Sequence, residues 1–183
     1  MKLTKILCCT FVLTALLFTA CKFEDEAHFT PEIRVISPIV RSHYDTHAHD
    51  TLFIYRSEDG LVMDTIFVGD TVFFDVTFNT YANNMQSISI KHDTASVELG
   101  YMEREKLDSL FLPESDIDNG EFLLDEGIIG VRLQFYYLAL QEDENPKLEF
   151  TLTSDSKFSP GMLKFATPIV KPEDLDEGET SIE

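Results

Sequence analysis

Alternation between apolar and polar side chains is the feature that most limits what this chain can fold into. It is clearest over residues 71–81, where Val72, Phe74, Val76 and Phe78 alternate with Thr71, Asp75, Thr77 and Asn79. Successive side chains of a β-strand point to opposite faces of its sheet, so this pattern predicts a strand with one face buried and the other exposed. The centre of the chain is therefore predicted to be a half-buried strand.

Similar patterns recur along most of the chain. We predict strands over residues 32–40, 51–56, 61–68, 71–81, 121–125, 130–141 and 162–170, with two more around Ile88 and Ile90 and around Leu148, Phe150 and Leu152. Asp59-Gly60 is a turn signal and predicts a hairpin between the second and third of these. Pro38 lacks a backbone donor, so the first strand is expected at a sheet edge or where a strand changes sheets.

Short strands separated by turn signals predict an all-β domain. We favour an immunoglobulin-like antiparallel β-sandwich, with an antiparallel β-barrel as the alternative. The last two strands resemble the closing hairpin of bacterial immunoglobulin-like surface domains. One short helix is predicted near residues 101–112, where Leu107, Leu110 and Phe111 have helical spacing before Pro113.

The N-terminus has the order of a secretory signal. Lys2 and Lys5 precede an apolar run over residues 6–18 that is shorter than the roughly 20 residues of a membrane-spanning helix. The run ends in Phe18-Thr19-Ala20-Cys21. This sequence resembles the lipobox of bacterial lipoproteins. Phe18 replaces the commoner leucine, which is similar to lipoboxes of Bacteroidota.

The resemblance implies cleavage after Ala20 and attachment of acyl chains, such as palmitate, to Cys21. Residues 22–26, Lys-Phe-Glu-Asp-Glu, look like the surface-export signal of Bacteroidota lipoproteins, with Phe23 interrupting the pattern. We therefore expect an outer-membrane lipoprotein that faces the cell exterior. We predict that residues 1–20 are the signal peptide, 21–30 the lipidated cysteine and a flexible tether, 31–171 the β-sandwich domain, and 172–183 an acidic disordered tail.

Charge and cysteine usage exclude several classes of function. Two of the 14 basic residues and none of the 33 acidic residues lie in 1–20, so the mature chain carries 12 minus 33, or −21. Such a chain repels phosphate backbones, which argues against nucleic acid as a partner. The cysteines other than Cys21 are Cys8 and Cys9, which leave with the signal. The mature domain is thus predicted to lack disulfides and cysteine chemistry.

One loop carries candidate metal ligands. His43, Asp45, His47, His49 and Asp50 lie within eight residues. Imidazole and carboxylate groups suit zinc, copper, nickel or iron. The alternative interpretation is a polar loop whose histidines meet only solvent.

A second loop suggests calcium. It contains Asp116, Asp118 and Glu121, and it begins with the Asp-x-Asp of an EF-hand loop. Its glycine comes one place early and no glutamate stands at the twelfth position. The alternative is a solvated acidic loop.

Two aromatic residues, Phe73 and Tyr136, lie on the strand faces opposite the predicted core. If these rings are exposed, they would stack on a sugar or on a partner protein. The alternative is that extra strands or a helix cover this face, so that the rings pack inside the domain. The familiar local motifs of enzymes, such as Gly-x-Ser-x-Gly and His-Glu-x-x-His, do not occur.

We therefore expect a non-catalytic, lipid-anchored surface module that binds a glycan or an envelope protein, or that serves a structural role in the envelope, and we expect no cofactor. The alternatives are a metal-binding lipoprotein using His43, His47 and His49, and an envelope hydrolase whose carboxylates converge from separate loops.

Overall fold

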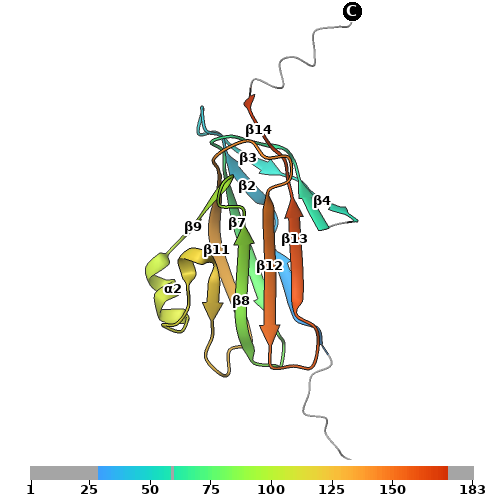
Figure 1. Ribbon diagram of the computed structural model, residues 1–183, viewed down its shortest axis with the longest axis vertical. Coiled ribbons are helices and arrows are strands. Elements are labelled where there is room, and N and C mark those ends of the chain that lie inside the picture. Colours follow the sequence, from blue (N-terminus) through green and yellow to red (C-terminus); the bar gives the residue numbers. More distant parts are fainter. Residues whose placement is uncertain (1–28, 59, 173–183) are drawn as a thin grey trace, which may run out of the picture.

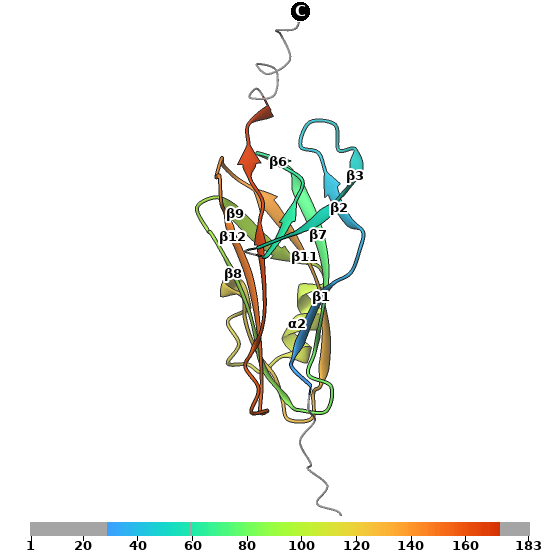
Figure 2. The ribbon, with the colours of Figure 1, turned by 90° about the vertical axis from the view of Figure 1, so that its right-hand side faces the viewer.

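The computed structural model describes residues 29–58 and 60–172 (Figure 1). Cys21, the predicted signal peptide, most of the predicted tether and residues 173–183 of the predicted tail lie outside the described residues. The elements form two large sheets, A and B, and a small two-stranded sheet. Figure 2 shows sheets A and B as two layers.

Sheet A has the strand order β3-β2-β7-β11-β9, and β1 also pairs with β7. Its strands are β1 (Glu32–Val35), β2 (Ile39–Ser42), β3 (His49–Leu52), β7 (Thr71–Asn79), β9 (Val97–Tyr101) and β11 (Gly130–Ala139). All its pairings are antiparallel.

Sheet B has the order β10-β8-β12-β13-β5-β4. Its strands are β4 (Ile54–Ser57), β5 (Gly60–Met63), β8 (Met85–His92), β10 (Glu121–Leu123), β12 (Lys147–Ser154) and β13 (Gly161–Ala166). The pairing of β5 with β13 is parallel, as is that of β6 (Ile66–Phe67) with β14 (Ile169–Val170) in the small sheet.

This connectivity confirms the immunoglobulin-like sandwich. In such a domain the first, second, fifth and fourth strands share one sheet, and the third, sixth and seventh share the other. Here β1, β7, β11 and β9 occupy the places of the first set, and β8, β12 and β13 those of the second. The antiparallel sheets do not close into a barrel, so the alternative is excluded.

Four predicted strands are each divided in the structure, and two of them, residues 61–68 and 162–170, become β5 with β6 and β13 with β14. Residues 32–40 form β1 and β2, which pair with opposite halves of β7 on either side of the cis Ser37-Pro38 bond. The strand therefore stays beside one neighbour and does not change sheets at Pro38. The chain passes from sheet A to sheet B within residues 51–56, because Leu52 pairs within sheet A and Ile54 pairs within sheet B. The crossing is at Phe53.

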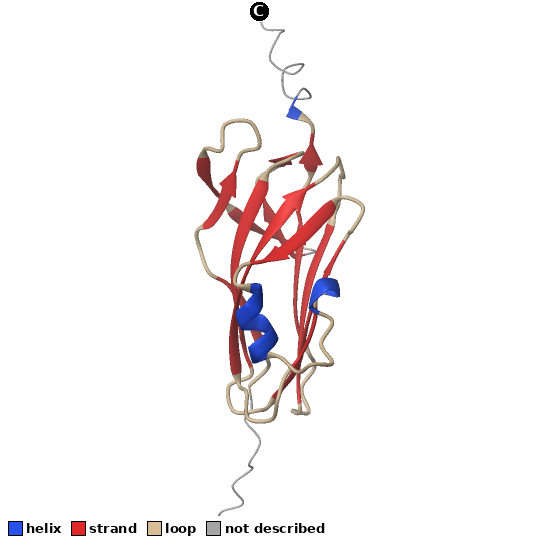
Figure 3. Ribbon diagram, turned by 90° about the vertical axis from the view of Figure 1, so that its left-hand side faces the viewer, coloured by secondary structure: helices blue, strands red, loops and turns tan. Residues whose placement is uncertain are grey.

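The region between β8 and β11 departs most from prediction. The expected helix is α2 (Arg104–Leu110), shorter than residues 101–112, because Tyr101 ends strand β9. Leu107 and Phe111 are buried, whereas Leu110 is 42% exposed. A short 3₁₀ helix, Ile117–Asn119, follows. Figure 3 shows both helical segments beside the lower halves of the strands.

The core is aromatic and lies between the two sheets. Phe74 and Phe135 of sheet A stack at 5.1 Å between ring centroids, and Phe135 lies 5.9 Å from Phe150 of sheet B. The inward sets predicted for β7, β11 and β12 are all buried, namely Val72, Phe74, Val76, Phe78, Val131, Leu133, Phe135, Tyr137, Leu148, Phe150 and Leu152. Their burial confirms the faces assigned from alternation.

The strands run lengthwise between two ends of the domain. The chain enters at residue 29, at the end that carries the loops β7–β8 and β12–β13, and residue 172 lies at the opposite end (Figure 1). Helices in the described residues are all too short or too polar to cross a membrane.

Candidate functional site

The outer face of sheet A carries an aromatic row. Phe73 of β7 lies directly across from Tyr136 of β11, and both side chains are half-buried on the side away from the core. Val40 of β2 continues the row on one side, and Gly100 of β9 continues it on the other. Residues paired directly across antiparallel strands share a face, so the row runs across four strands.

Tyr136 packs over the glycine beside it. A Cβ atom added to Gly100 would lie 1.9 Å from Cζ of Tyr136 and 2.1 Å from its hydroxyl oxygen. The phenol ring therefore covers the position where any other residue would place its side chain. At the other end of the row, the ring of Phe73 lies 6.5 Å from that of His49. The Tyr136 ring therefore lies toward β9, whereas the Phe73 ring lies on the side of β3.

Three polar side chains lie next to this row on the same face. Arg132 donates from Nε to Oδ1 of Asp75 at 2.8 Å, and its Nη2 donates to Oδ2. Gln134 donates from Nε2 to Oδ2 of Asp75 at 3.0 Å. The hydrogen bonds from Arg132, with help from Gln134, hold the pKa of Asp75 below its usual value. The carboxylate is therefore ionised and fixed at neutral pH.

A groove adjoins the polar group. Its volume is about 280 Å³, and it lies between the α2 region and β11. Its lining includes Met102, Lys106 and Leu110 on one side and Arg132 and Gln134 on the other. Apolar walls with a few placed polar groups are the usual composition of a ligand site. We call the groove, with Phe73, Asp75, Arg132, Gln134 and Tyr136, the sheet A site.

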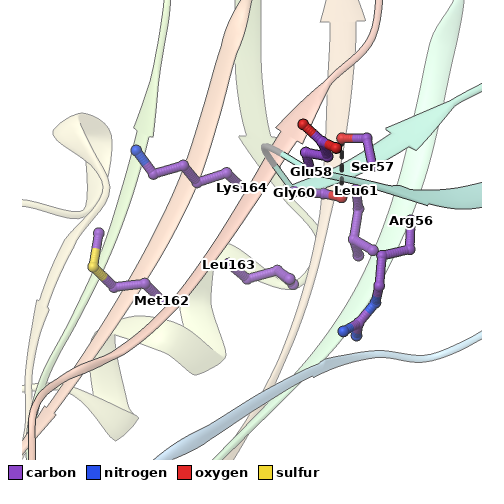
Figure 4. A pocket seen from close by; sticks show the side chains of 8 residues that line it. All are labelled: Arg56, Ser57, Glu58, Gly60, Leu61, Met162, Leu163 and Lys164. Carbon is purple, nitrogen blue, oxygen red and sulfur yellow. Dashed lines mark hydrogen bonds between the residues drawn. The ribbon is translucent and has the colours of Figure 1, made fainter.

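A larger hollow of about 410 Å³ lies on sheet B, between the β4–β5 hairpin and β13. Figure 4 shows that its two cationic side chains, Arg56 and Lys164, extend in different directions. Lys164 instead pairs with Glu149 of β12 at 2.7 Å. Because its polar groups do not converge, this hollow is a weaker candidate for a binding site.

An arginine holds together the segment that carries the predicted metal ligands, residues 43–50, which we call the histidine loop. Arg41 of β2 donates to both carboxylate oxygens of Asp50 on β3, at 3.0 and 2.5 Å. Its Nη1 also lies 3.6 Å from the fully buried Asp70. His43 lies between the two carboxylates, at 3.3 Å from Asp50 and 3.6 Å from Asp70. The hydrogen bonds from Arg41 lower the pKa of Asp50.

The other predicted metal ligands point elsewhere. Asp45, His47 and His49 are exposed. Across residues 29–58 and 60–172, no three His, Cys, Asp or Glu side chains are placed to hold a metal ion together. The guanidinium of Arg41 lies where a cation shared by Asp50 and Asp70 would have to bind, because it hydrogen-bonds both oxygens of Asp50 and forms an ion pair with Asp70.

The predicted calcium ligands also have separate protein partners. Asp116 caps the 3₁₀ helix by accepting from the backbone and side chain of Asn119. Asp118 lies 3.2 Å from Arg104, and Glu121 accepts from Ser89 at 2.8 Å. The loop is thus built from local hydrogen bonds and ion pairs.

Sequence reasoning found part of the sheet A site and missed the rest. Alternation identifies Phe73 and Tyr136 as outward aromatics, but it does not mark Asp75, Arg132 and Gln134 as site residues. The available signal was their spacing, since Asp75 is two residues from Phe73, and Gln134 two from Tyr136. That spacing puts each pair on one face of its strand, but only the register between β7 and β11 brings the two pairs together.

Comparisons with known proteins do not assign the chain to a family. No family model and no curated protein matches it. Among solved structures, it is similar to a family 123 glycoside hydrolase from Clostridium perfringens, studied for glycolipid glycan hydrolysis, with 9% identity and a TM-score of 0.43. The match covers 78% of this chain but only 27% of that enzyme's chain. A likeness this distant carries no functional argument.

Proposed function

We propose that the protein is a non-catalytic binding module of a bacterial envelope, anchored by lipid at Cys21 and displayed on the cell surface, which binds a neutral glycan at the sheet A site. The observation that carries this proposal is the aromatic row next to the group of Asp75, Arg132 and Gln134. Both lie on one outer face, and Arg132 and Gln134 of the polar group also line the groove.

The chemistry of this face fits a sugar. A sugar ring presents C–H groups on its faces and hydroxyl groups on its rim. Half-buried rings such as Phe73 and Tyr136 offer flat apolar surface at a low cost in conformational entropy. Carboxylate, guanidinium and amide groups supply both acceptors and donors for hydroxyls, and the mutual hydrogen bonds of Asp75, Arg132 and Gln134 hold them in place.

Charge favours a neutral ligand. The whole chain carries a formal charge of −19, which disfavours anionic polymers at long range. Within the site, the positive charge of Arg132 is matched by Asp75, and Lys106 lies 2.5 Å from Glu103. A groove of about 280 Å³ suits one or two sugar units rather than a long polymer.

The test is a glycan screen on the purified mature chain, followed by thermal unfolding with each hit. A ligand at a hundredfold excess over its Kd stabilises the folded state by about 2.7 kcal/mol. We expect Y136A and Q134A to weaken binding at least tenfold, because they remove stacking surface and a rim donor. Tyr55→Ala is the matched control, because Tyr55 is an exposed aromatic on strand β4 of the other sheet.

The same samples distinguish the alternatives. Equal binding by Y136A, Q134A and the Y55A control would refute the sheet A site. Release of shorter sugars from a bound glycan would show a hydrolase and end the non-catalytic proposal. Replacing Cys21 with Ala tests the anchor, because a variant that still fractionates with membranes would refute lipidation there.

A further inference from the structure

Exposed apolar side chains gather at the end of the domain where the chain enters. They come from four separate segments: Phe29 before β1 (59% exposed), Tyr81 between β7 and β8 (38%), Ile129 before β11 (48%) and Phe158 between β12 and β13 (38%). The rings of Phe29 and Tyr81 lie 5.1 Å apart.

The strand register places these segments at one end. Asn79, the last residue of β7, pairs with both Glu32 at the start of β1 and Gly130 at the start of β11. Ser154, the last residue of β12, pairs with Met85 at the start of β8. Figure 2 shows β1, the first strand, beginning at this same end.

The backbone at Tyr81 holds its ring in position at this end. Its φ of 62° is in the left-handed region, which bulky residues rarely adopt. Its amide donates to Oδ1 of Asn79 at 2.6 Å, and its hydroxyl donates to Glu32 at 2.6 Å. The ring is thus held at the tip of the domain with its hydroxyl group already bonded.

The distance to the anchor is short. Eight peptide units connect Cys21 to Phe29. A fully extended chain spans about 3.3–3.6 Å per residue, so this connection reaches at most about 28 Å. If Cys21 carries the lipid, as the proposed function requires, Phe29 stays within that distance of the membrane surface, and the other three side chains belong to segments at the same end of the domain.

We propose that this end of the domain, with Phe29, Tyr81, Ile129 and Phe158 as its contact residues, seats on the interface of the membrane that holds the lipid anchor. Aromatic side chains favour the membrane–water interface, where the ring meets apolar groups and its polar edge meets water.

The charges at this end indicate which lipid surface it fits. Glu32 is bonded to Tyr81 and Arg34, and Asp155 accepts two hydrogen bonds from Asn84, so both carboxylates already have partners. Asp125 and Glu126 are exposed at the same end and would be repelled by anionic headgroups. Lys157 is exposed beside Phe158 at the same end, so the charges there are mixed and the surface fits zwitterionic lipid. Seated in this way, the domain would stand upright, with β14 and the β2–β3 loop pointing away from the membrane.

The absence of tryptophan from the sequence allows a direct test. The full lipidated chain carries one reporter, F158W or Y81W, and is reconstituted in vesicles of phosphatidylcholine with brominated acyl chains. The matched control is F53W, because Phe53 is 65% exposed and lies between β3 and β4, in the half of the domain that carries the opposite end. We expect F158W and Y81W to show blue-shifted emission, quenched at least threefold more strongly than that of F53W.

The outcomes separate this inference from the proposed function. If the chain floats with the vesicles but all reporters are quenched equally, or none is quenched, the seating is refuted and the anchor stands. If the chain does not float with the vesicles, both the anchor and the seating are refuted. A matched quenching series with C21A, which should lose all quenching, shows whether the contact needs the anchor.

Discussion

The outer faces of the two sheets differ, although the same alternation builds both. On sheet A the central outward residues are large and fixed, with Phe73 and Tyr136 beside the Asp75–Arg132 pair. On sheet B the outward residues include small hydroxyls, where Ser87 and Thr153 lie 2.6 Å apart between their oxygens, together with the Glu149–Lys164 ion pair and the exposed Met162. The inner faces are alike, since Phe135 of sheet A and Phe150 of sheet B are both fully buried.

This difference shows where the fold leaves room for function. Inward positions must be apolar on both sheets because they share one core. Outward positions are free of that demand, and their residue types indicate what else the face does. Large rings on an outer face expose apolar area that folding alone does not require. Ser and Thr side chains on an outer face hydrogen-bond one another across the strands and do not indicate a further role.

The largest expected effect is the same for both sheets. Phe135→Ala and Phe150→Ala should each lower the free energy of unfolding by about 4 kcal/mol, because each removes a buried ring from the shared core. Urea denaturation of both variants measures this. A loss below about 1 kcal/mol for one of the two variants would show that the inner faces of the two sheets do not contribute equally to stability.

The next effect concerns the hairpin that widens sheet A. Asp70 is fully buried, accepts from the amide of Phe67 at 3.0 Å, and lies beside Arg41 and His43. Asp70→Ala should cost about 3 kcal/mol, because it leaves the 11%-exposed Arg41 side chain with one carboxylate fewer. Hydrogen exchange should show that the loss of amide protection is concentrated around β2 and β3. Uniform loss of protection throughout sheet B would contradict this assignment.

A third change separates stability from binding on the outer face of sheet A. Gly100→Ala places a methyl group on the ring of Tyr136 and should displace it, at a cost of about 1 kcal/mol in stability. Glycan binding should fall by much more than this stability change implies. Thr153→Ala on sheet B is the control, with a small stability loss and unchanged binding. If G100A still binds the glycan as tightly as the wild type, Tyr136 is not part of the binding site.

The smallest effect is a pH dependence. The pKa of Asp75 is lowered in the folded state, so its ion pair stabilises the fold above the unfolded pKa of about 3.9 and is lost as pH falls through the folded value. The stability gap between the wild type and Asp75→Asn should be present at pH 7 and shrink below about pH 4. Unfolding curves at pH 7 and pH 3 measure it, and a constant gap would show that the charge is not responsible.

The candidate site could be predicted only in part. Alternation identified Phe73 and Tyr136 as outward-facing, because period 2 is a local property of each strand. It could not pair β7 with β11 or place α2 beside them. Conversely, closeness in sequence suggested that His43, His47 and His49 act together. In the structure the three histidines do not converge, because only His43 turns toward Asp50 and Asp70.

The sequence by itself determined the class of fold, the inward faces of the long strands, the position of the helix near Leu107 and the excess of negative charge. These follow from local alternation, spacing and composition. The tertiary structure decided that the chain crosses between sheets at Phe53 rather than at Pro38, that β9 exists, and which outer residues meet. Those features depend on strand pairing between residues far apart in the chain, and pairing is fixed by the shared core rather than by any local pattern.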